Sequence, residues 1–196
     1  MTDDLQWKAQ DIDLARVGIE TTYAGVRFRS RLEARWAAMF DLLKWHWDYE
    51  PIDLSEYVPD FVLHMPRAPL LVEVKPALSL AEYADPARKV CLSGWRRDFM
   101  VVGSSLPRTS SGEAILGRLW YWEPPGGPPA EWDGGDSAVA HRCTHCRALS
   151  AHQESGGWQC LVCGFYDGVR GVGDASAVEV DTLWREAGNR VQWRKA

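Results

Sequence analysis

The sequence predicts a mixed β-sheet flanked by helices, of the α/β or α+β class, with a small metal-binding module near its C-terminal end. Helical and strand-like stretches alternate through the first part of the chain, an order typical of a sheet covered by helices. Two Cys-x-x-Cys pairs follow a stretch rich in proline and glycine. We therefore expect a core at 1–122, a linker at 123–137, a cysteine module at 138–170, and a helix and tail at 171–196 that dock on the core.

A helix is predicted at 30–43, where apolar residues such as Trp36 and Phe40 recur at helical spacing. Ser30 precedes Glu33 by three residues. This is the pattern of a capping box, in which both side chains satisfy free amides of the first helical turn. Glu33 therefore has a structural interpretation in addition to any chemical one.

Apolar and aromatic residues bounded by turn-forming residues predict the strands, at 45–50, 57–63, 70–75, 99–102 and 115–122. The first three are joined by short segments, which favours an antiparallel meander. Helical spacing returns at 79–92, with an interruption expected near Asp85-Pro86.

Acidic residues and a lysine mark two of these strands. Asp60 follows Pro59, and Glu73-Val74-Lys75 begins thirteen residues after the aspartate. Because strand side chains alternate, Glu73 and Lys75 share one face. If the strands are neighbours, Asp60 approaches Glu73. Two carboxylates suit a hard cation such as Mg²⁺, so these residues predict a divalent-cation site beside an ammonium group.

This order of residues and elements resembles the signature of the PD-(D/E)XK nuclease superfamily, especially its small phage-encoded members. The residues that carry the resemblance are Glu33, Pro59-Asp60 and Glu73-Val74-Lys75. It covers roughly residues 20 to 105. The resemblance implies a restriction-endonuclease-like fold and a DNA endonuclease that depends on Mg²⁺ or Mn²⁺.

The resemblance also implies a role for each matched residue. Asp60 and Glu73 would bind the catalytic metal, with the Val74 carbonyl as a third ligand. Lys75 would position the attacking water or help to deprotonate it. Glu33 would reach the same site from the helix and bind a second metal or a metal-bound water, in competition with its capping role.

The cysteines predict a separate structural metal site. The ligands are Cys143, Cys146, Cys160 and Cys163, with thirteen residues between the two pairs. This spacing is typical of a zinc ribbon, in which four thiolates close the tetrahedron around Zn²⁺. Cys91 lies outside the pattern and is expected to pack as a small apolar residue.

The net charge of −5 gives no overall attraction to a polyanion, so contact with nucleic acid must come from local basic patches. Arg27, Arg29, Arg31 and Arg35 form the best of these and are expected to contact the DNA backbone without reading sequence. The sequence leaves open whether the zinc ribbon contacts DNA or a protein partner. It also leaves open whether the chain forms a homodimer.

The start of the chain lacks the features of a secretion signal, and no apolar run reaches membrane-spanning length. We therefore expect a cytoplasmic protein without a membrane partner, located in the host cytoplasm if it is phage-encoded. Two alternatives to an autonomous nuclease stay open. One is a non-catalytic nucleic-acid-binding or assembly protein that works through its zinc ribbon, and the other is a nuclease subunit that needs a partner.

Overall fold

The computed structural model describes residues 18–54, 56–122, 135–153, 159–166 and 173–192. The strands are β1 (Thr21–Tyr23), β2 (Val26–Phe28), β3 (Trp47–Tyr49), β4 (Phe61–Leu63), β5 (Leu70–Val74), β6 (Phe99–Val102), β7 (Ile115–Trp120), β8 (Asp136–Arg142), β9 (Leu149–Gln153) and β10 (Gly173–Asp174). The helices are α2 (Arg31–Leu43), the 3₁₀ helix η1 (Leu80–Tyr83), α3 (Ala84–Leu92) and α4 (Ala177–Arg190).

The predicted mixed sheet with flanking helices is confirmed. Eight strands form one sheet in the order β10-β8-β7-β6-β5-β4-β3, and β9 pairs with β8 outside this order. The meander β3-β4-β5 is antiparallel, as the short connections predicted. Within the described sheet only β5 and β6 run parallel, and the connection between them carries η1 and α3. The strands β1 and β2 form a separate hairpin.

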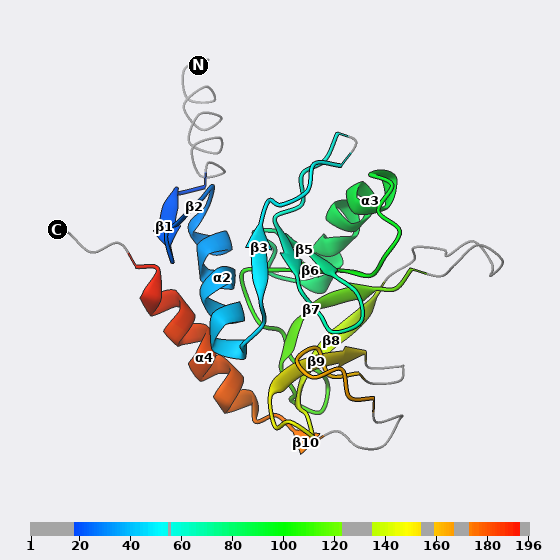
Figure 1. Cartoon of the computed structure of the whole chain (residues 1–196). Coiled ribbons are helices and arrows are strands. Elements are labelled where there is room, and N and C mark those ends of the chain that lie inside the picture. Colours follow the sequence, from blue (N-terminus) through cyan, green and yellow to red (C-terminus); the bar gives the residue numbers. More distant parts are fainter. Residues whose placement is uncertain (1–17, 55, 123–134, 154–158, 167–172, 193–196) are drawn as a thin grey trace, which may run out of the picture.

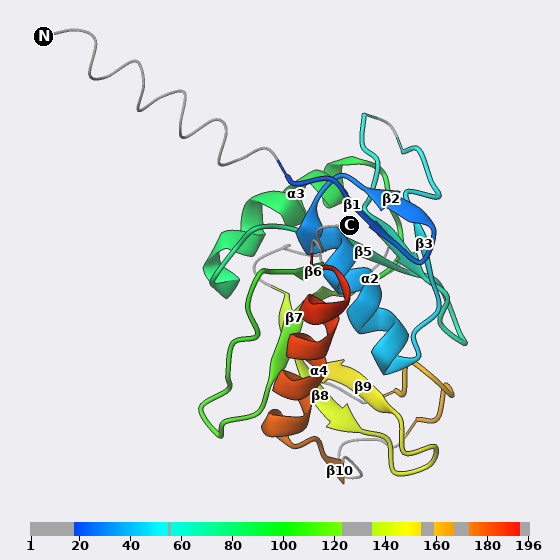
Figure 2. The ribbon, with the colours of Figure 1, turned by 90° about the vertical axis from the view of Figure 1, so that its left-hand side faces the viewer.

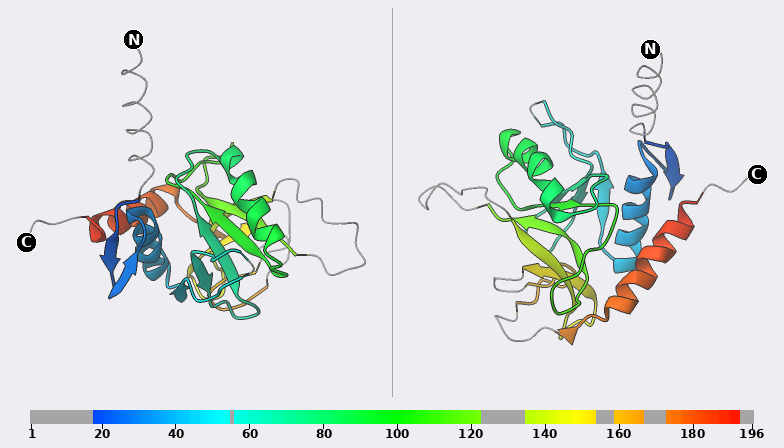
Figure 3. Two further views of the ribbon diagram at one scale, coloured as in Figure 1. Left: turned by 90° about the horizontal axis from the view of Figure 1, so that it is seen from above. Right: turned by 180° about the vertical axis from the view of Figure 1, so that it is seen from behind.

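The helices cover both faces of the sheet. Figure 1 shows α2 and α4 on one side and α3 on the other, and the view from above in Figure 3 shows the same three layers. Figure 2 shows α4 running alongside α2. Trp184 of α4 packs its ring against Trp36 of α2, with the ring centroids 4.8 Å apart. Helix α4 therefore packs against α2, and residues 193–196 of the predicted tail lie outside the described residues.

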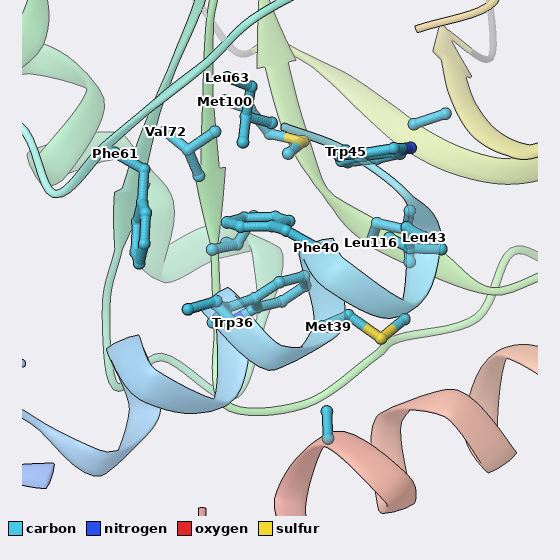
Figure 4. Packing of buried hydrophobic residues seen from close by; sticks show 14 of the residues in the cluster. Trp36, Met39, Phe40, Leu43, Trp45, Phe61, Leu63, Val72, Met100 and Leu116 are labelled. Atoms are coloured by element: carbon cyan, nitrogen blue, oxygen red, sulfur yellow. The ribbon is translucent and has the colours of Figure 1, made fainter. Parts of the chain in front are cut away.

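The larger core lies between α2 and the sheet. Trp36 and Phe40 point from the helix toward strand residues such as Phe61 and Val72 (Figure 4), and all four are fully buried. Burying one large apolar side chain contributes about 1.5–3 kcal/mol. A second core lies under α3 on the opposite face. Strand β5 is consequently buried on both faces, which makes a carboxylate in it exceptional.

The cysteine segment is continuous with the main sheet, and this differs from the separate module predicted at 138–170. β8 pairs with β7 and starts at Asp136, inside the predicted linker at 123–137. Residues 123–134 lie outside the described residues. The two pairs of cysteines therefore extend a hairpin of the main sheet.

No helix among the described residues is long and apolar enough to cross a bilayer.

Candidate functional site

The structure brings Asp60, Glu73 and Lys75 together at one end of β4 and β5. Both carboxylates are almost fully buried, with 2% of Asp60 and 3% of Glu73 exposed. The Lys75 Nζ forms an ion pair with Glu73 and lies 4.0 Å from the Asp60 Oδ2. The Val74 amide donates a hydrogen bond of 2.7 Å to the same Asp60 oxygen. The antiparallel register of β4 and β5, in which Phe61 faces Val72, produces this meeting.

Burial and the neighbouring charge of Glu73 disfavour ionisation of Asp60. Burial, followed by the charge of Glu73, raises the pKa of Asp60 to about 7, although Lys75 and the Val74 amide act in the opposite direction. The hydroxyl of Tyr57 donates a hydrogen bond to Glu73. Burial and the charge of Glu73 also raise the pKa of Tyr57, which keeps its hydroxyl a donor. A cation placed here would relieve the repulsion.

Arg29 is the residue of this centre whose role the sequence did not reveal. Its Nη2 lies 2.5 Å from the Asp60 Oδ1, and its Nε lies 2.8 Å from the Glu50 Oε1. Partial burial acts to lower the pKa of Arg29, but the hydrogen bond that Arg29 donates to Tyr49 and the charges of Asp60 and Glu50 outweigh it, so the pKa lies above its ordinary value. Arg29 was predicted to contact DNA, and the structure places it at the acidic centre together with Glu50.

Ser30 caps the helix, as its spacing from Glu33 predicted, but the Glu33 carboxylate accepts from the amide of Arg29, one residue before the N-cap. The Ser30 Oγ accepts a hydrogen bond from the Glu33 amide and donates one of 2.8 Å to its carboxylate. The other Oε accepts from the Arg29 amide at 3.2 Å and from the Tyr49 hydroxyl at 2.6 Å. The Arg29 Nε also lies 3.9 Å from Glu33. Glu33 therefore connects to Asp60 through Arg29.

An open groove runs past the acidic centre. Glu73 and Lys75 line its floor, and Lys89 of α3 contributes to its wall together with Arg29 and Tyr57. The side chain of Lys75 is 33% exposed, so its ammonium connects the buried carboxylates with solvent. A ligand in this groove would meet the cations Lys75 and Lys89 and the exposed carboxylate of Glu56 before it reaches the buried carboxylates.

The other predicted DNA-contacting arginines have different surroundings. Arg31 is exposed, and Arg27 forms an exposed ion pair of 2.5 Å with Glu20. Arg35 lies 3.6 Å above the ring of Trp184 and donates two hydrogen bonds to the carbonyl of that residue. The guanidinium of Arg35 thus attaches α4 to α2, which is a structural role that the clustering of charges did not indicate.

The four predicted cysteine ligands converge. Their sulfur atoms lie within 4.8 Å of one another, close enough to hold one metal ion. The Cys143–Cys163 and Cys146–Cys160 Sγ distances are 3.8 and 3.7 Å, and all four thiols are free. His145 stacks on Phe165 and is not part of the group.

The two cysteine pairs form geometrically equivalent turns. The Arg147 amide donates to the Cys143 carbonyl and the Gly164 amide to the Cys160 carbonyl, both at 2.9 Å. The residue after each second cysteine has a left-handed backbone, with φ of 63° at Arg147 and 74° at Gly164. Glycine suits this conformation, whereas arginine adopts it at some cost. The repeated geometry indicates that both turns serve one centre.

Comparisons with known proteins do not identify the chain. No protein-family model, curated protein or solved structure matches it. The resemblance carried by the acidic motif therefore stays a prediction, and any function has to be argued from the residues of the site.

Proposed function

We propose that this protein is a divalent-metal-dependent nuclease that hydrolyses phosphodiester bonds in DNA. The observation that carries the proposal is the meeting of Asp60, Glu73 and Lys75 beside an open groove. Burying two neighbouring carboxylates is costly unless a cation compensates them. Strongly perturbed acids in a cleft are typical of functional sites.

The donor set fits Mg²⁺ or Mn²⁺. Carboxylate oxygens are hard ligands, and Mg²⁺ commonly takes one or two of them and leaves its other positions to water and phosphate. Counted as ionised, Glu33, Glu50, Asp60 and Glu73 exceed the two cations that contact them by two charges. One divalent cation would balance that excess. When bound, such an ion supplies Lewis-acid activation of water and neutralises charge on the phosphate.

The residues of the chain would divide the work. Asp60 and Glu73 hold the cation, and the Val74 amide and the Tyr57 hydroxyl orient these carboxylates by hydrogen bonds. Lys75 reaches from the carboxylates into the groove, where its ammonium can orient a water molecule, or its neutral amine can accept a proton from that water during attack on phosphorus. Lys89, on the groove wall, is placed to attract a phosphate.

The cysteine cluster would hold a structural Zn²⁺. A tetrahedral site with Zn–S bonds of about 2.3 Å has S–S edges of about 3.8 Å. The two Sγ distances of 3.8 and 3.7 Å agree with this value. Four thiolates leave no open ligand position for a substrate. The metal at the cysteines therefore stabilises the hairpin that carries it, and the chemistry takes place at the carboxylates.

A cleavage assay tests the proposed activity. The zinc-loaded full chain is incubated with duplex, single-stranded and branched DNA in Mg²⁺, in Mn²⁺ and without either ion. We expect cleavage only with a divalent ion, and a loss of about 100-fold or more in Glu73→Gln and in Lys75→Met. Glu186→Gln, an exposed carboxylate on α4 that pairs with Arg190, is the control and keeps full activity.

Two results would overturn the proposal. One is equal cleavage by the wild type and an Asp60→Asn, Lys75→Met double variant, since this would identify a contaminating nuclease. The other is the absence of cleavage on all three DNA forms and on RNA while the chain remains folded and zinc-loaded.

A further inference from the structure

The guanidinium of Arg29 lies where a cation is needed at the acidic centre. It forms an ion pair with Asp60 at 2.5 Å and another with Glu50 at 2.8 Å, and it lies 3.9 Å from Glu33. Lys75 neutralises Glu73 in a similar way from the other side. In this state the cations of the chain compensate only part of the negative charge of the centre.

The backbone of Arg29 is held in place, whereas the end of its side chain is accessible. The Arg29 amide donates to the Glu33 carboxylate and to the Tyr49 hydroxyl, both at 3.2 Å. The side chain is nevertheless 57% exposed, in contrast to 3% for the side chain of Asp60. Moving the guanidinium therefore disturbs little packing, and its contact with Asp60 is open to solvent competition.

Arg29 and a divalent cation would compete for the same carboxylate. The Asp60 Oδ2 already accepts the Val74 amide, and the Oδ1 is covered by the guanidinium of Arg29. An ion bound at the Oδ1 would stand next to a positive charge at hydrogen-bond distance. This repulsion weakens metal binding until the guanidinium leaves.

The open groove offers Arg29 a second position. Arg29 lines this groove together with Lys75 and Lys89, so its released guanidinium stays on the proposed path of the substrate. The guanidinium fork matches the oxygen pair of a phosphate and binds it in a bidentate manner. A backbone phosphate could therefore replace Asp60 as the partner of Arg29.

We propose that Arg29 is an exchangeable cation, which covers Asp60 in the metal-free protein and turns to a backbone phosphate of the substrate when a divalent cation binds. The inference rests on the proposed function and adds to it an order of events. Release of Arg29 by the ion prepares the contact with DNA, so metal binding and DNA binding strengthen each other through one side chain.

Substitution of Arg29 tests whether its guanidinium competes with the divalent cation for Asp60 or only stabilises the site. The zinc-loaded full chain is titrated with Mn²⁺ without DNA, and free Mn²⁺ is followed by its electron paramagnetic resonance signal. We expect Arg29→Gln to lower the Kd for Mn²⁺ about fivefold, because a competing exposed charge is removed. In a Lys75→Met background, which keeps the DNA intact, the same substitution weakens binding of a short duplex in Mn²⁺ about fivefold.

Matched variants control for unrelated effects. Arg27→Gln removes an exposed arginine of the preceding strand β2 and leaves the Kd for Mn²⁺ unchanged, since Arg27 pairs with Glu20. Arg29→Lys keeps a competing charge and retains a Kd within about twofold of the wild type. Thermal melting checks that Arg29→Gln folds. If it does not fold, Arg29→Met is used to remove the same charge.

The outcomes distinguish the two proposals. If the wild type binds Mn²⁺ and cleaves DNA, but Arg29→Gln and Arg29→Met bind Mn²⁺ no more tightly, the exchange is wrong and the nuclease stands. If the wild type shows no Mn²⁺ binding that is lost in Asp60→Asn, both proposals fail. Tighter Mn²⁺ binding together with weaker DNA binding supports the exchange.

Discussion

The two candidate metal centres of this protein are built in different ways. The four cysteines come from two equivalent turns that lie close in the sequence, on either side of β9. The acidic centre combines Asp60 and Glu73 from neighbouring strands with Arg29, which lies just before α2. One site is thus formed by local turns, and the other exists only when the sheet and the helix are packed together.

The two centres also differ in what remains open around them. The sulfur atoms surround a single position and offer a complete ligand set. Glu73 lines an open groove, and cations of the chain already pair with both Glu73 and Asp60. A closed ligand set is suited to stabilising a fold, whereas a partly neutralised set beside an open groove is suited to exchange and chemistry. Three substitutions test this contrast.

Loss of a cysteine ligand should have the largest effect. Cys143 is fully buried in the cluster, and removal of one thiolate from a structural zinc site costs much of the metal-binding energy. We expect Cys143→Ser to lower the free energy of unfolding by about 3 kcal/mol or more. Guanidinium unfolding followed by tryptophan fluorescence measures this loss, and atomic absorption measures the zinc content.

Cys91→Ser is the control for the cysteine substitution, because Cys91 lies outside the cluster. It should keep one zinc ion per chain and most of the stability. If the two variants unfold at the same denaturant concentration, the cysteine cluster is not a stabilising metal site.

Substitution of Asp60 should raise the free energy of unfolding, whereas loss of a cysteine ligand lowers it. Because burial raises the pKa of Asp60 to about 7, its ionised form destabilises the fold without a divalent ion. We expect Asp60→Asn to raise the free energy of unfolding by about 2 kcal/mol at pH 8. Thermal and denaturant unfolding of the zinc-loaded protein, without Mg²⁺ or Mn²⁺, measure the gain.

The pH dependence follows from the same shift. A carboxyl whose pKa is higher in the folded state contributes stability below its ordinary pKa of 3.8, and this contribution is lost as the pH rises to about 7. The advantage of Asp60→Asn should therefore shrink as the pH falls from about 7 toward 4. A variant that is less stable than the wild type at pH 8 would show that the Asp60 charge is compensated within the chain.

Among the three substitutions, that of Glu33 should change the free energy of unfolding least. Its carboxylate accepts from Ser30, Arg29 and Tyr49, and an amide in its place cannot satisfy all of these donors. We expect Glu33→Gln to lower the free energy of unfolding by about 1 kcal/mol. Cleavage should fall less than in Glu73→Gln, because Glu33 acts through Arg29.

The chain contains a matched control for Glu33. Glu82 accepts from Ser79 in the capping box of η1, but it is exposed and is not among the residues that line the groove. Glu82→Gln should destabilise the protein less than Glu33→Gln and leave cleavage unchanged. Equal losses of stability in the two variants would show that Glu33 only stabilises the start of its helix.

Features that depend on local spacing could be predicted from the sequence. The cysteine ligands are set by two short turns, and the approach of Asp60 to Glu73 follows from strand alternation and a short connection. Arg29 could not be assigned, because a long charged side chain selects its partner only after the helix and the sheet have packed. Tyr57 carried a weak signal, since it lies three residues before Asp60.

The pairing of β8 and the first hairpin also escaped prediction. β8 begins directly after the proline- and glycine-rich stretch, so the composition predicted a linker there. In the structure this segment pairs with β7. β1 and β2 meet at Ala24-Gly25, where both residues have positive φ. A two-residue hairpin requires this backbone, but alanine is not a typical residue for it. Tertiary pairing overrode local preference in both places.

The parallel pairing of β5 with β6 has a consequence for how this protein can diversify. Parallel neighbours require a long crossover, and here the crossover supplies Lys89 to the groove without contributing a carboxylate. Insertions or new charges in η1 and α3 would reshape what enters the groove while the strand register that unites Asp60 and Glu73 stays intact. Under the proposed function, substrate choice and bond breaking can evolve independently.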